Sequence, residues 1–380
     1  MSPADHRAAR LATRLAFLVA GFGMACWAPL VPFAKQRLAV DDGVLGLLLL
    51  CLGVGSVAAM LLTGVLSARH GSRPIIIGGG VALAILLPLL SIVATPATLG
   101  LALFGFGAAL GSIDVAMNIH AVEVEHASDR PLMSGFHAQF SIGGFAGSAL
   151  MTLLLAMQAG AFIGTLICAA LMLVAMALAA PRLLRAARAD EPPPLFVMPH
   201  GIVLLLAALA AVLFLVEGAM LDWGALLLTD SNLLPAAQSG VGYMLFSIAM
   251  TAGRLGGDAV VARIGDRATI IWGSCIAIAG FVLLLTASIA AIALAGFLLI
   301  GLGASNIVPV LFRRAGAQRA MPVGLAVAAI TTTGYAGVLL GPAGIGFVAK
   351  HSNLQTSFWI LAALLVAVAA CAHRVTADKA

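Results

Sequence analysis

Long apolar stretches follow one another through this sequence, and they constrain the fold more than any other feature. Each holds roughly 20 residues or more, enough for a helix to cross the hydrocarbon core of a membrane. The alternating segments of roughly ten residues that mark a membrane β-barrel are absent from the sequence. With 62% hydrophobic and 9% charged residues, the chain is predicted to be an all-α integral membrane protein. Twelve spans are expected: 12–35, 43–68, 73–94, 97–123, 131–157, 160–181, 199–228, 237–262, 268–287, 289–311, 321–349 and 353–372.

Basic residues predict the orientation of these spans. Of the 20 Lys and Arg residues, 16 fall on the side of the N-terminus, three fall on the other side, and Arg254 lies within a span. Cytoplasmic loops are enriched in Lys and Arg, so both termini are predicted to be cytoplasmic in a bacterial-type inner membrane. The net charge of +5 follows from this topology and gives no argument for binding nucleic acid. Arg7, Arg10 and Arg14 precede a first span too long for a signal peptide, so we expect that span to be retained.

A hydrophilic segment divides the twelve spans into six and six. We predict an N-terminal bundle at 1–181, a cytoplasmic linker at 182–198 and a C-terminal bundle at 199–380. The two halves also match at offsets of roughly 190 to 196 residues, as expected for an internal repeat. "SARHGSRPII" at 67–76 matches "VARIGDRATI" at 261–270, "GGFAGSALM" at 143–151 matches "TGYAGVLLG" at 333–341, and Trp27 falls opposite Trp223.

Several segments carry a resemblance to a known family. They include "ACWAPLVPF", "SIDVAMN", "PLMSGFHAQFSIGGFAG", "EGAMLDWGALLL" and "TTGYAGVLLGPAGIGFVA". Over essentially the whole chain, the sequence resembles the major facilitator superfamily of secondary transporters, in the branch of the MosC-like rhizopine transporters related to the fucose permeases. The resemblance implies 12 transmembrane helices in two pseudo-symmetric six-helix bundles, alternating access, and a monomer without cofactors.

Asp114 and Asn118 are the first candidate site residues. Both fall on one face of the fourth span, with Asp114 near the membrane midplane. An intramembrane carboxylate costs about 2.5–3.5 kcal/mol at a helix centre, so it is expected to face a cavity or a partner. Asp114 is either a proton carrier or a hydrogen-bond acceptor for substrate. The structural alternative is a carboxylate satisfied by neighbouring helices.

Three further polar residues are assigned to the substrate site. His137 and Gln139 lie about two turns into the fifth span, where the histidine serves either a proton relay or helix packing. Asn306 lies near the middle of the tenth span, close to Pro309. It either binds substrate hydroxyls or caps the backbone group that the proline leaves unpaired.

The seventh span contains two carboxylates, at Glu217 and Asp222. Five residues separate them, which turns them about 140° apart on an ideal helix. Glu217 is therefore assigned to substrate binding and Asp222 to an outer gate, and both join Asp114 as proton-coupling candidates. Trp223 and Trp27 are either interface anchors or stacking platforms for substrate. Bends are expected at Pro29 in span one and near Gly224 in span seven.

The gating candidates lie in the two matching basic loops or in the span that leads into the second loop. The first resembles the cytoplasmic signature loop of the superfamily, although Ala68 stands at its acidic position. The second offers a charged latch, with Asp266, between span eight and span eleven or its neighbours. The alternative is a set of positive-inside arginines without a gating role. The candidates are Gly64, Arg69, Gly71, Arg73, Arg254, Asp258, Arg263 and Gly265.

The predicted function is proton-coupled transport of a small polar solute, such as a sugar or polyol. Its expected partners are the solute, protons and membrane lipid. The alternatives are a drug or metabolite efflux pump and a non-transporting receptor or scaffold, whereas a lipid enzyme would need a nucleophile or metal. The sequence contains no GxxxxGK[ST] loop, Cys/His cluster or HExxH motif, so neither ATP use, metal, cofactor nor enzymatic activity is predicted.

Overall fold

The protein is helical throughout the part of the chain that the structure describes. This structure, a computed structural model, describes residues 3–40, 42–128, 130–185, 199–235 and 240–377, which form helices and no strands. Ten helices in these ranges are long and apolar enough to cross a membrane. One of them, α10 (Val241–Thr286), contains two predicted spans, and α13 (Val323–His351) completes the twelve-helix fold.

The helices form two compact units. Unit 1 comprises residues 1–129, 136–198 and 322–328, and unit 2 comprises residues 130–135, 199–321 and 329–380. Residues 133–135 of unit 2 begin a helix whose remainder lies in unit 1. Residues 323–328 of unit 1 begin a helix whose remainder lies in unit 2. The domain boundaries expected at 181 and 199 remain a prediction, and most of the expected linker, residues 186–198, lies outside the described residues.

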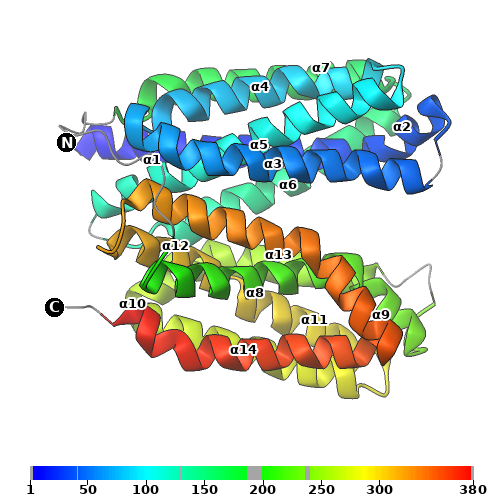
Figure 1. Cartoon of the computed structure of the whole chain (residues 1–380), viewed down its shortest axis with the longest axis vertical. Coiled ribbons are helices and arrows are strands. Elements are labelled where there is room, and N and C mark those ends of the chain that lie inside the picture. Colours follow the sequence, from blue (N-terminus) through cyan, green and yellow to red (C-terminus); the bar gives the residue numbers. More distant parts are fainter. Residues whose placement is uncertain (1–2, 41, 129, 186–198, 236–239, 378–380) are drawn as a thin grey trace. The chain divides into compact units, whose positions relative to one another are not determined.

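Unit 1 is arranged around α5 (Figure 1). This helix is buried along most of its length and packs against α1, α3 and α4, while α7 packs against α1 and α4. Small residues on α5 permit these close contacts. The helices of this part of the chain are α1 (Pro3–Trp27), η1 (Ala28–Leu30), α2 (Val31–Leu38), α3 (Asp42–His70), α4 (Ser72–Ile92), α5 (Pro96–His126), α6 (Met133–Ala156), α7 (Ala161–Ala179) and η2 (Ala180–Arg182).

Unit 2 is arranged around α10, which packs against α11 and α14. The helix α8 packs against α12 and α14. Besides α10 and α13, the helices of this part of the chain are α8 (Ile202–Asp222), α9 (Gly224–Asp230), α11 (Ala290–Ala304), α12 (Ile307–Ala317) and α14 (Leu354–Thr376).

The two basic loops that match in sequence also match in backbone conformation. Gly71 has φ 79° and ψ 166°, and Gly265 has φ 79° and ψ 167°. Only glycine adopts this region readily, because a Cβ would clash with the backbone. Gly265 also separates the two spans that form α10. The internal repeat is confirmed at this position.

Three spans are interrupted within the membrane region. Span one changes to a 3₁₀ turn after Trp27, at Pro29, and span seven is interrupted at Trp223; both interruptions lie where bends were predicted. The third break, between α11 and α12 at Ser305 and Asn306, was not predicted. Pro309 has no N–H to donate to the carbonyl of Ser305, which weakens the helix at this place.

Glycines allow α6 to approach α1 closely. A Cβ on Gly143 would lie 2.3 Å from the carbonyl oxygen of Leu18, and one on Gly147 equally close to that of Phe22. In unit 2, a Cβ on Gly337 of α13 would lie 2.8 Å from the carbonyl oxygen of Ala211 in α8. Gly143 and Gly147 form a GxxxG pair, a spacing that permits close backbone packing of two helices, and the second half repeats this close packing.

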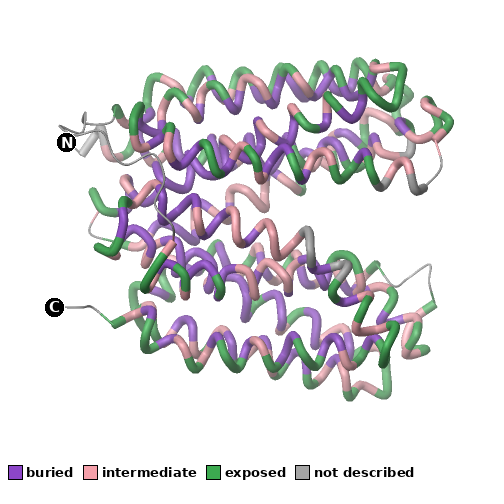
Figure 2. The backbone as a smooth tube through the Cα atoms, in the orientation of Figure 1, coloured by how far each residue is buried: buried purple, intermediate pink, exposed green. Residues whose placement is uncertain are grey.

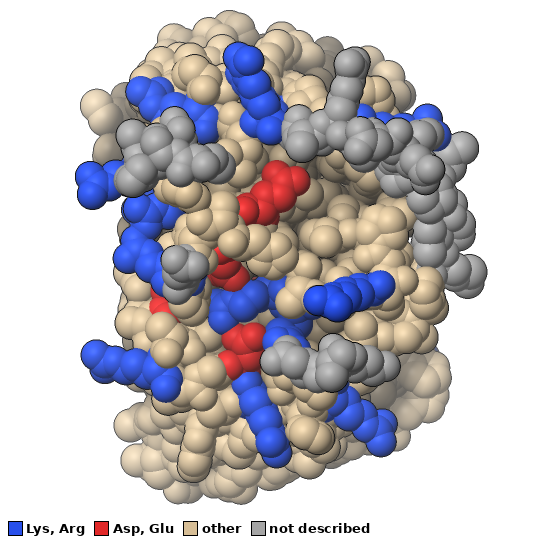
Figure 3. Space-filling view, turned by 90° about the vertical axis from the view of Figure 1, so that its left-hand side faces the viewer, with Lys and Arg blue, Asp and Glu red and all other residues tan. Residues whose placement is uncertain are grey.

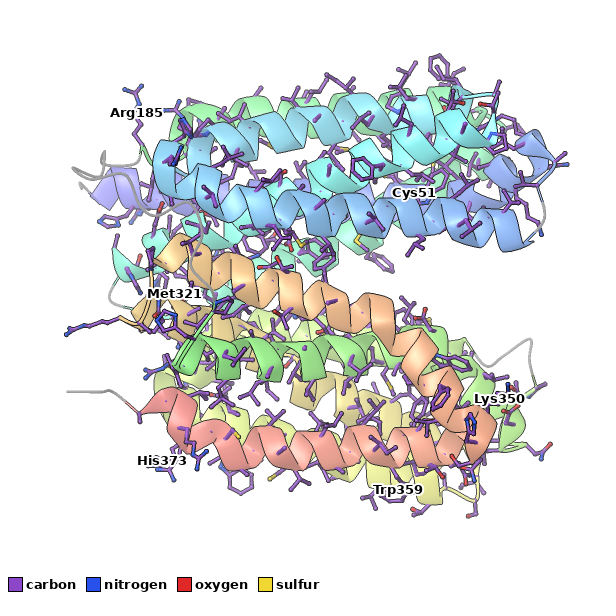
Figure 4. The ribbon with its side chains drawn as sticks, viewed as in Figure 1. Cys51, Arg185, Met321, Lys350, Trp359 and His373 are labelled. Atoms are coloured by element: carbon purple, nitrogen blue, oxygen red, sulfur yellow. The ribbon has the colours of Figure 1, made fainter. Side chains whose placement is uncertain are left out.

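Exposed apolar residues and basic residues are distributed as a membrane protein requires. Exposed positions continue along the helices between their ends (Figure 2), and they include Leu101 and Phe145. The face shown in Figure 3 carries many more Lys and Arg than Asp and Glu side chains. Within unit 2, Lys350 lies at the end of the helices opposite Met321 and His373 (Figure 4), as the predicted topology requires.

Candidate functional site

Asp114 and Asn118 lie together on the buried face of α5 in unit 1. Asp114 is 8% exposed and Asn118 is 1% exposed. The Asn118 amide donates to the backbone carbonyl of Asp114 over 2.9 Å and to its Oδ1 over 3.4 Å. Among the described residues, none forms an ion pair with Asp114. This carboxyl group is therefore buried beside an amide, and no ion pair with a described residue compensates its charge.

The other candidates of unit 1 lie on α1 and α6. Trp27 ends α1, and its buried Nε1 has no hydrogen-bond partner among the described residues. The ring of His137 meets Phe17 edge-on with centroids 5.3 Å apart, which supports its packing role. Gln139 is half-buried on the same helix. Unpaired buried donors are rare in folded proteins, so the indole N–H of Trp27 is an unusual feature of this unit.

His120 is a buried polar residue that the sequence analysis missed. The backbone N–H of Leu184 donates to its Nε2 over 2.9 Å, and the Thr13 hydroxyl lies 3.0 Å from its Nδ1. Thr13 donates its own proton to Ala9, so Nδ1 of His120 is the donor in this pair. A neutral imidazole thus connects α1, α5 and the segment after α7. Only its polarity within an apolar span could have revealed it.

In unit 2 the central feature is an ion pair between α8 and α10. Arg254 donates from Nη2 to Oε1 of Glu217 over 3.1 Å. The side chain of Arg254 is 8% exposed and that of Glu217 is 25% exposed. The sequence position of Arg254, near the basic loop, predicts a gating role, whereas the structure places it beside Glu217, a substrate-site candidate.

The break in the tenth span adjoins this pair. Nε of Arg254 donates to the carbonyl of Ser305 over 3.3 Å, and this is the carbonyl that Pro309 leaves without its helical donor. The Asn306 amide donates instead to the carbonyl of Gly253 and to the hydroxyl of Ser305. Arg254 therefore caps this carbonyl, a role that the sequence suggested for Asn306. The buried Oδ1 of Asn306 has no partner among the described residues.

The two acids of the seventh span, Glu217 and Asp222, lie in different environments, as their spacing predicts. Asp222 is exposed at the end of α8, while Glu217 lies one and a half turns deeper. Trp223 follows at the break, and its ring packs over Gly346. Its buried Nε1, like that of Trp27, has no hydrogen-bond partner among the described residues. The two tryptophans thus share both their place at a break and their unpaired N–H.

The four gating candidates in and near the first basic loop differ in their burial. Gly64 is buried, and a Cβ there would lie 2.6 Å from Cβ of Ala328, at the start of α13. Gly71 supplies the positive φ described above. Arg69 is exposed and Arg73 is half-buried. Gly64 and Gly71 thus have steric roles in this loop.

Asp258 holds the first turn of α6. Its Oδ1 accepts from the N–H of Ser134 and its Oδ2 from the N–H of Gly135, both over 3.0 Å. These residues belong to unit 2, so the contact lies within that unit. A carboxylate at a helix N-terminus satisfies unpaired donors and complements the helix dipole. The acid thus contacts span five, whereas the sequence suggested span eleven or its neighbours.

A second acidic contact forms at the other side of Gly265. Asp266 accepts from Arg313 of α12 over 2.5 Å and lies 3.8 Å from Arg314. Arg314 also donates to the carbonyl of Val375 at the end of α14. Arg263 is exposed on α10. The charged contacts of this loop are therefore with span ten, and Arg314 connects that span to the end of span twelve.

The described residues contain no group of three or more His, Cys, Asp or Glu side chains that could hold a metal ion.

Comparison with known proteins places this chain among transporters. A sequence profile of the Major Facilitator Superfamily matches residues 14–320. An uncharacterized MFS-type transporter of Yersinia pestis is 49% identical over 97% of this chain and 96% of its own length. The membrane protein MosC of Rhizobium meliloti is 30% identical over 93% of this chain and 86% of its own. The resemblance to MosC is thereby confirmed.

Solved structures share the fold at low sequence identity. The human organic anion transporter MFSD10 has a TM-score of 0.78 and 15% identity, covering 98% of this chain and 100% of its own. The fucose:proton symporter FucP of E. coli has a TM-score of 0.73 and 16% identity, covering 97% and 98%. Together with the match over residues 14–320 and the twelve-helix architecture, these findings show that the chain belongs to the Major Facilitator Superfamily.

Proposed function

We propose that this protein is a proton-coupled secondary transporter of a small polar solute, in the class of sugars, polyols and related compounds. It works by alternating access as a monomer in a bacterial-type inner membrane. Both termini face the cytoplasm. The excess of basic side chains on the face in Figure 3 supports this orientation through the positive-inside rule.

The environment of Asp114 is the observation that carries this proposal. An ionised carboxylate without a compensating charge costs about 2.5–3.5 kcal/mol at the centre of a membrane helix. Protonation removes the charge, so the free energy of the conformational change depends on whether a proton is bound. That dependence is what a coupling group must supply. Glu217 has a different environment, because Arg254 lies 3.1 Å from it and stabilises its ionised form.

The polar groups around the two acids support a hydrophilic solute. Asn118 and Asn306 each have a buried carbonyl oxygen without a partner among the described residues, and Trp27 and Trp223 each have such an N–H. Donors and acceptors of this kind suit hydroxyl groups. FucP, a fucose:proton symporter of the same fold, supports both the solute class and the coupling. A broadly specific efflux pump would need fewer fixed polar groups and is the less favoured alternative.

Purified protein in liposomes that contain a pH-sensitive dye tests the function. We expect a proton flux when one pool among sugars, polyols and inositols is added. The flux should disappear in Asp114→Asn, because the amide cannot exchange a proton. The exposed Asp230 provides a matched control, and Asp230→Asn should retain the flux. Saturable uptake of a labelled solute without any proton movement would contradict the proposal.

A further inference from the structure

Arg254 places a permanent positive charge inside a membrane span. The guanidinium group remains protonated in proteins, and the residue is 7% exposed within α10. A charge in this position is costly unless another charge or a set of dipoles compensates it. The carboxylate of Glu217 and the carbonyl of Ser305 both contact it. The guanidinium is thus held in place by the helix break on one side and by an acid on the other.

Glu217 is the more accessible member of the pair. Its side chain is 25% exposed, against 8% for Arg254. A single contact, from Nη2 to Oε1, joins them, although arginine and carboxylate commonly form two parallel hydrogen bonds. Another carboxylate can therefore reach the same guanidinium from the side where Glu217 now lies.

Hydrogen-bonding groups surround this position. Asn306 and the hydroxyl of Ser305 adjoin Arg254 through Gly253 and the break in span ten. The buried Oδ1 of Asn306 has no partner among the described residues. These groups suit the hydroxyls of a ligand whose charged end lies at Arg254.

We propose that the transported solute carries a carboxylate, which takes the place of Glu217 beside Arg254 when Glu217 is protonated. This inference rests on the proposed function and names its solute class as small hydroxylated monocarboxylates. One proton binds to the carboxylate of Glu217, the hydrogen bond from Nη2 of Arg254 to Oε1 breaks, and a bond from Nη2 to the solute carboxylate forms. At this site one proton and one anion bind together, so the local exchange is electroneutral.

Charge balance favours this class over neutral sugars. Protonation of Glu217 removes one negative charge from beside Arg254, and an anionic solute restores it. The empty, deprotonated site and the loaded, protonated site then have the same net charge. Both can change conformation at a similar electrostatic cost. A neutral solute leaves the local charge more positive by one unit whenever Glu217 is protonated.

Matched pairs of solutes that differ mainly in charge test the proposal. The probes are gluconate with sorbitol, glucuronate with glucose, and glycerate with glycerol, added to the purified full-length protein. Binding is measured by intrinsic tryptophan fluorescence at mildly acidic and mildly alkaline pH. We expect at least one acid to bind about tenfold to a hundredfold more tightly than its neutral partner, as charged hydrogen bonds do. Binding should be stronger at acidic pH.

Four variants separate a binding role from a structural one. Glu217→Gln should bind the acid more tightly than the wild type and without pH dependence, because the competing carboxylate is gone. Arg254→Gln should lose acid binding. The double variant Glu217→Gln/Arg254→Gln removes both members of the ion pair, so it should fold, as circular dichroism can verify, yet still not bind the acid. Arg267→Gln, at an exposed position of α10, should bind as the wild type does.

The possible results divide clearly. Equal binding of the neutral partners, weaker acid binding in Glu217→Gln, retained acid binding in the double variant, or no binding by any acid would overturn the inference. If a neutral solute drives a proton flux that Asp114→Asn abolishes, the proposed function stands and the carboxylate assignment fails. If an acid binds through Arg254 and its uptake carries a proton flux that Asp114→Asn leaves unchanged, the anion site stands and Asp114 is not the coupling group. An acid that crosses without any proton would overturn both proposals.

Discussion

Gly71 and Gly265 lie 194 residues apart and have the same backbone conformation, with φ 79° and ψ within one degree. Each begins the helix that follows a basic loop. Because this conformation is reserved for glycine, the agreement shows that the two halves share more than a hydrophobic pattern. The repeat extends to the backbone of the loops.

Substitution of Gly265 tests this conformational requirement. A Cβ on Gly265 would meet no atom within 4 Å, so any loss of stability in Gly265→Ala comes from the backbone conformation. We expect a loss of about 1–3 kcal/mol, measured as a lower melting temperature in detergent. Gly256 also has open space and lies within a helix. Gly256→Ala should therefore be neutral or stabilising, and equal melting of both variants would refute the argument.

The close packing of α6 on α1 gives a second prediction. A Cβ on Gly147 would lie 2.3 Å from the carbonyl oxygen of Phe22, whereas one on Gly144 would lie 3.8 Å from that of Gly21. Gly147→Ala should thus destabilise the protein by about 1–3 kcal/mol, because the helices must separate. Gly144→Ala is the control and should change the melting temperature little. If both variants melt alike, the contact is not as tight as described.

The cap on α6 gives a third prediction. Asp258→Asn keeps one acceptor oxygen but loses the charge, and Asp258→Ala loses both hydrogen bonds to Ser134 and Gly135. The expected losses rise in that order, up to about 2 kcal/mol for alanine. Gly135→Ala should also destabilise, since its Cβ would lie 2.6 Å from Oδ2 of Asp258. Thermal melting compares the three variants. An Asp258→Ala protein as stable as the wild type would exclude a capping role.

The indole N–H groups at the two breaks give a fourth prediction. Trp27→Phe and Trp223→Phe keep an aromatic ring but remove a buried donor that has no partner among the described residues. If these donors bind the solute, the half-saturation concentration for transport should rise about tenfold. Stability should not fall, because no internal hydrogen bond is lost. Trp272 is 62% exposed, so Trp272→Phe is the control. Identical transport kinetics in all three variants would leave the tryptophans as membrane anchors.

Much of the fold could be predicted from the sequence, because the determining features are local. Each span is a continuous apolar stretch, and the bends at Pro29 and Gly224 follow from residues that disturb a helix wherever they occur. The spacing of Glu217 and Asp222 was also sufficient to separate them. The matching loops at Gly71 and Gly265 can be recognised as a repeat from the sequence alone.

The partners of the polar residues could not be predicted in the same way. Arg254 is near Asp258 in sequence, and only the packing of α8 against α10 brings Glu217 to it. The break at Ser305 depends on a similar contact, because Arg254 replaces the donor that Pro309 lacks. His120 was missed because its partners, Thr13 and Leu184, are distant in sequence. Such contacts between side chains depend on how neighbouring helices are rotated about their axes, which a local sequence pattern does not determine.

Comparison of net accumulation with exchange in liposomes tests the central claim most directly. Labelled solute is taken up either against its gradient, driven by an imposed pH gradient, or in exchange for unlabelled solute at equal pH. We expect Asp114→Asn to lose accumulation but to retain exchange, because exchange needs no net proton movement. Accumulation at the wild-type level in this variant would contradict the assignment of Asp114 as the coupling group.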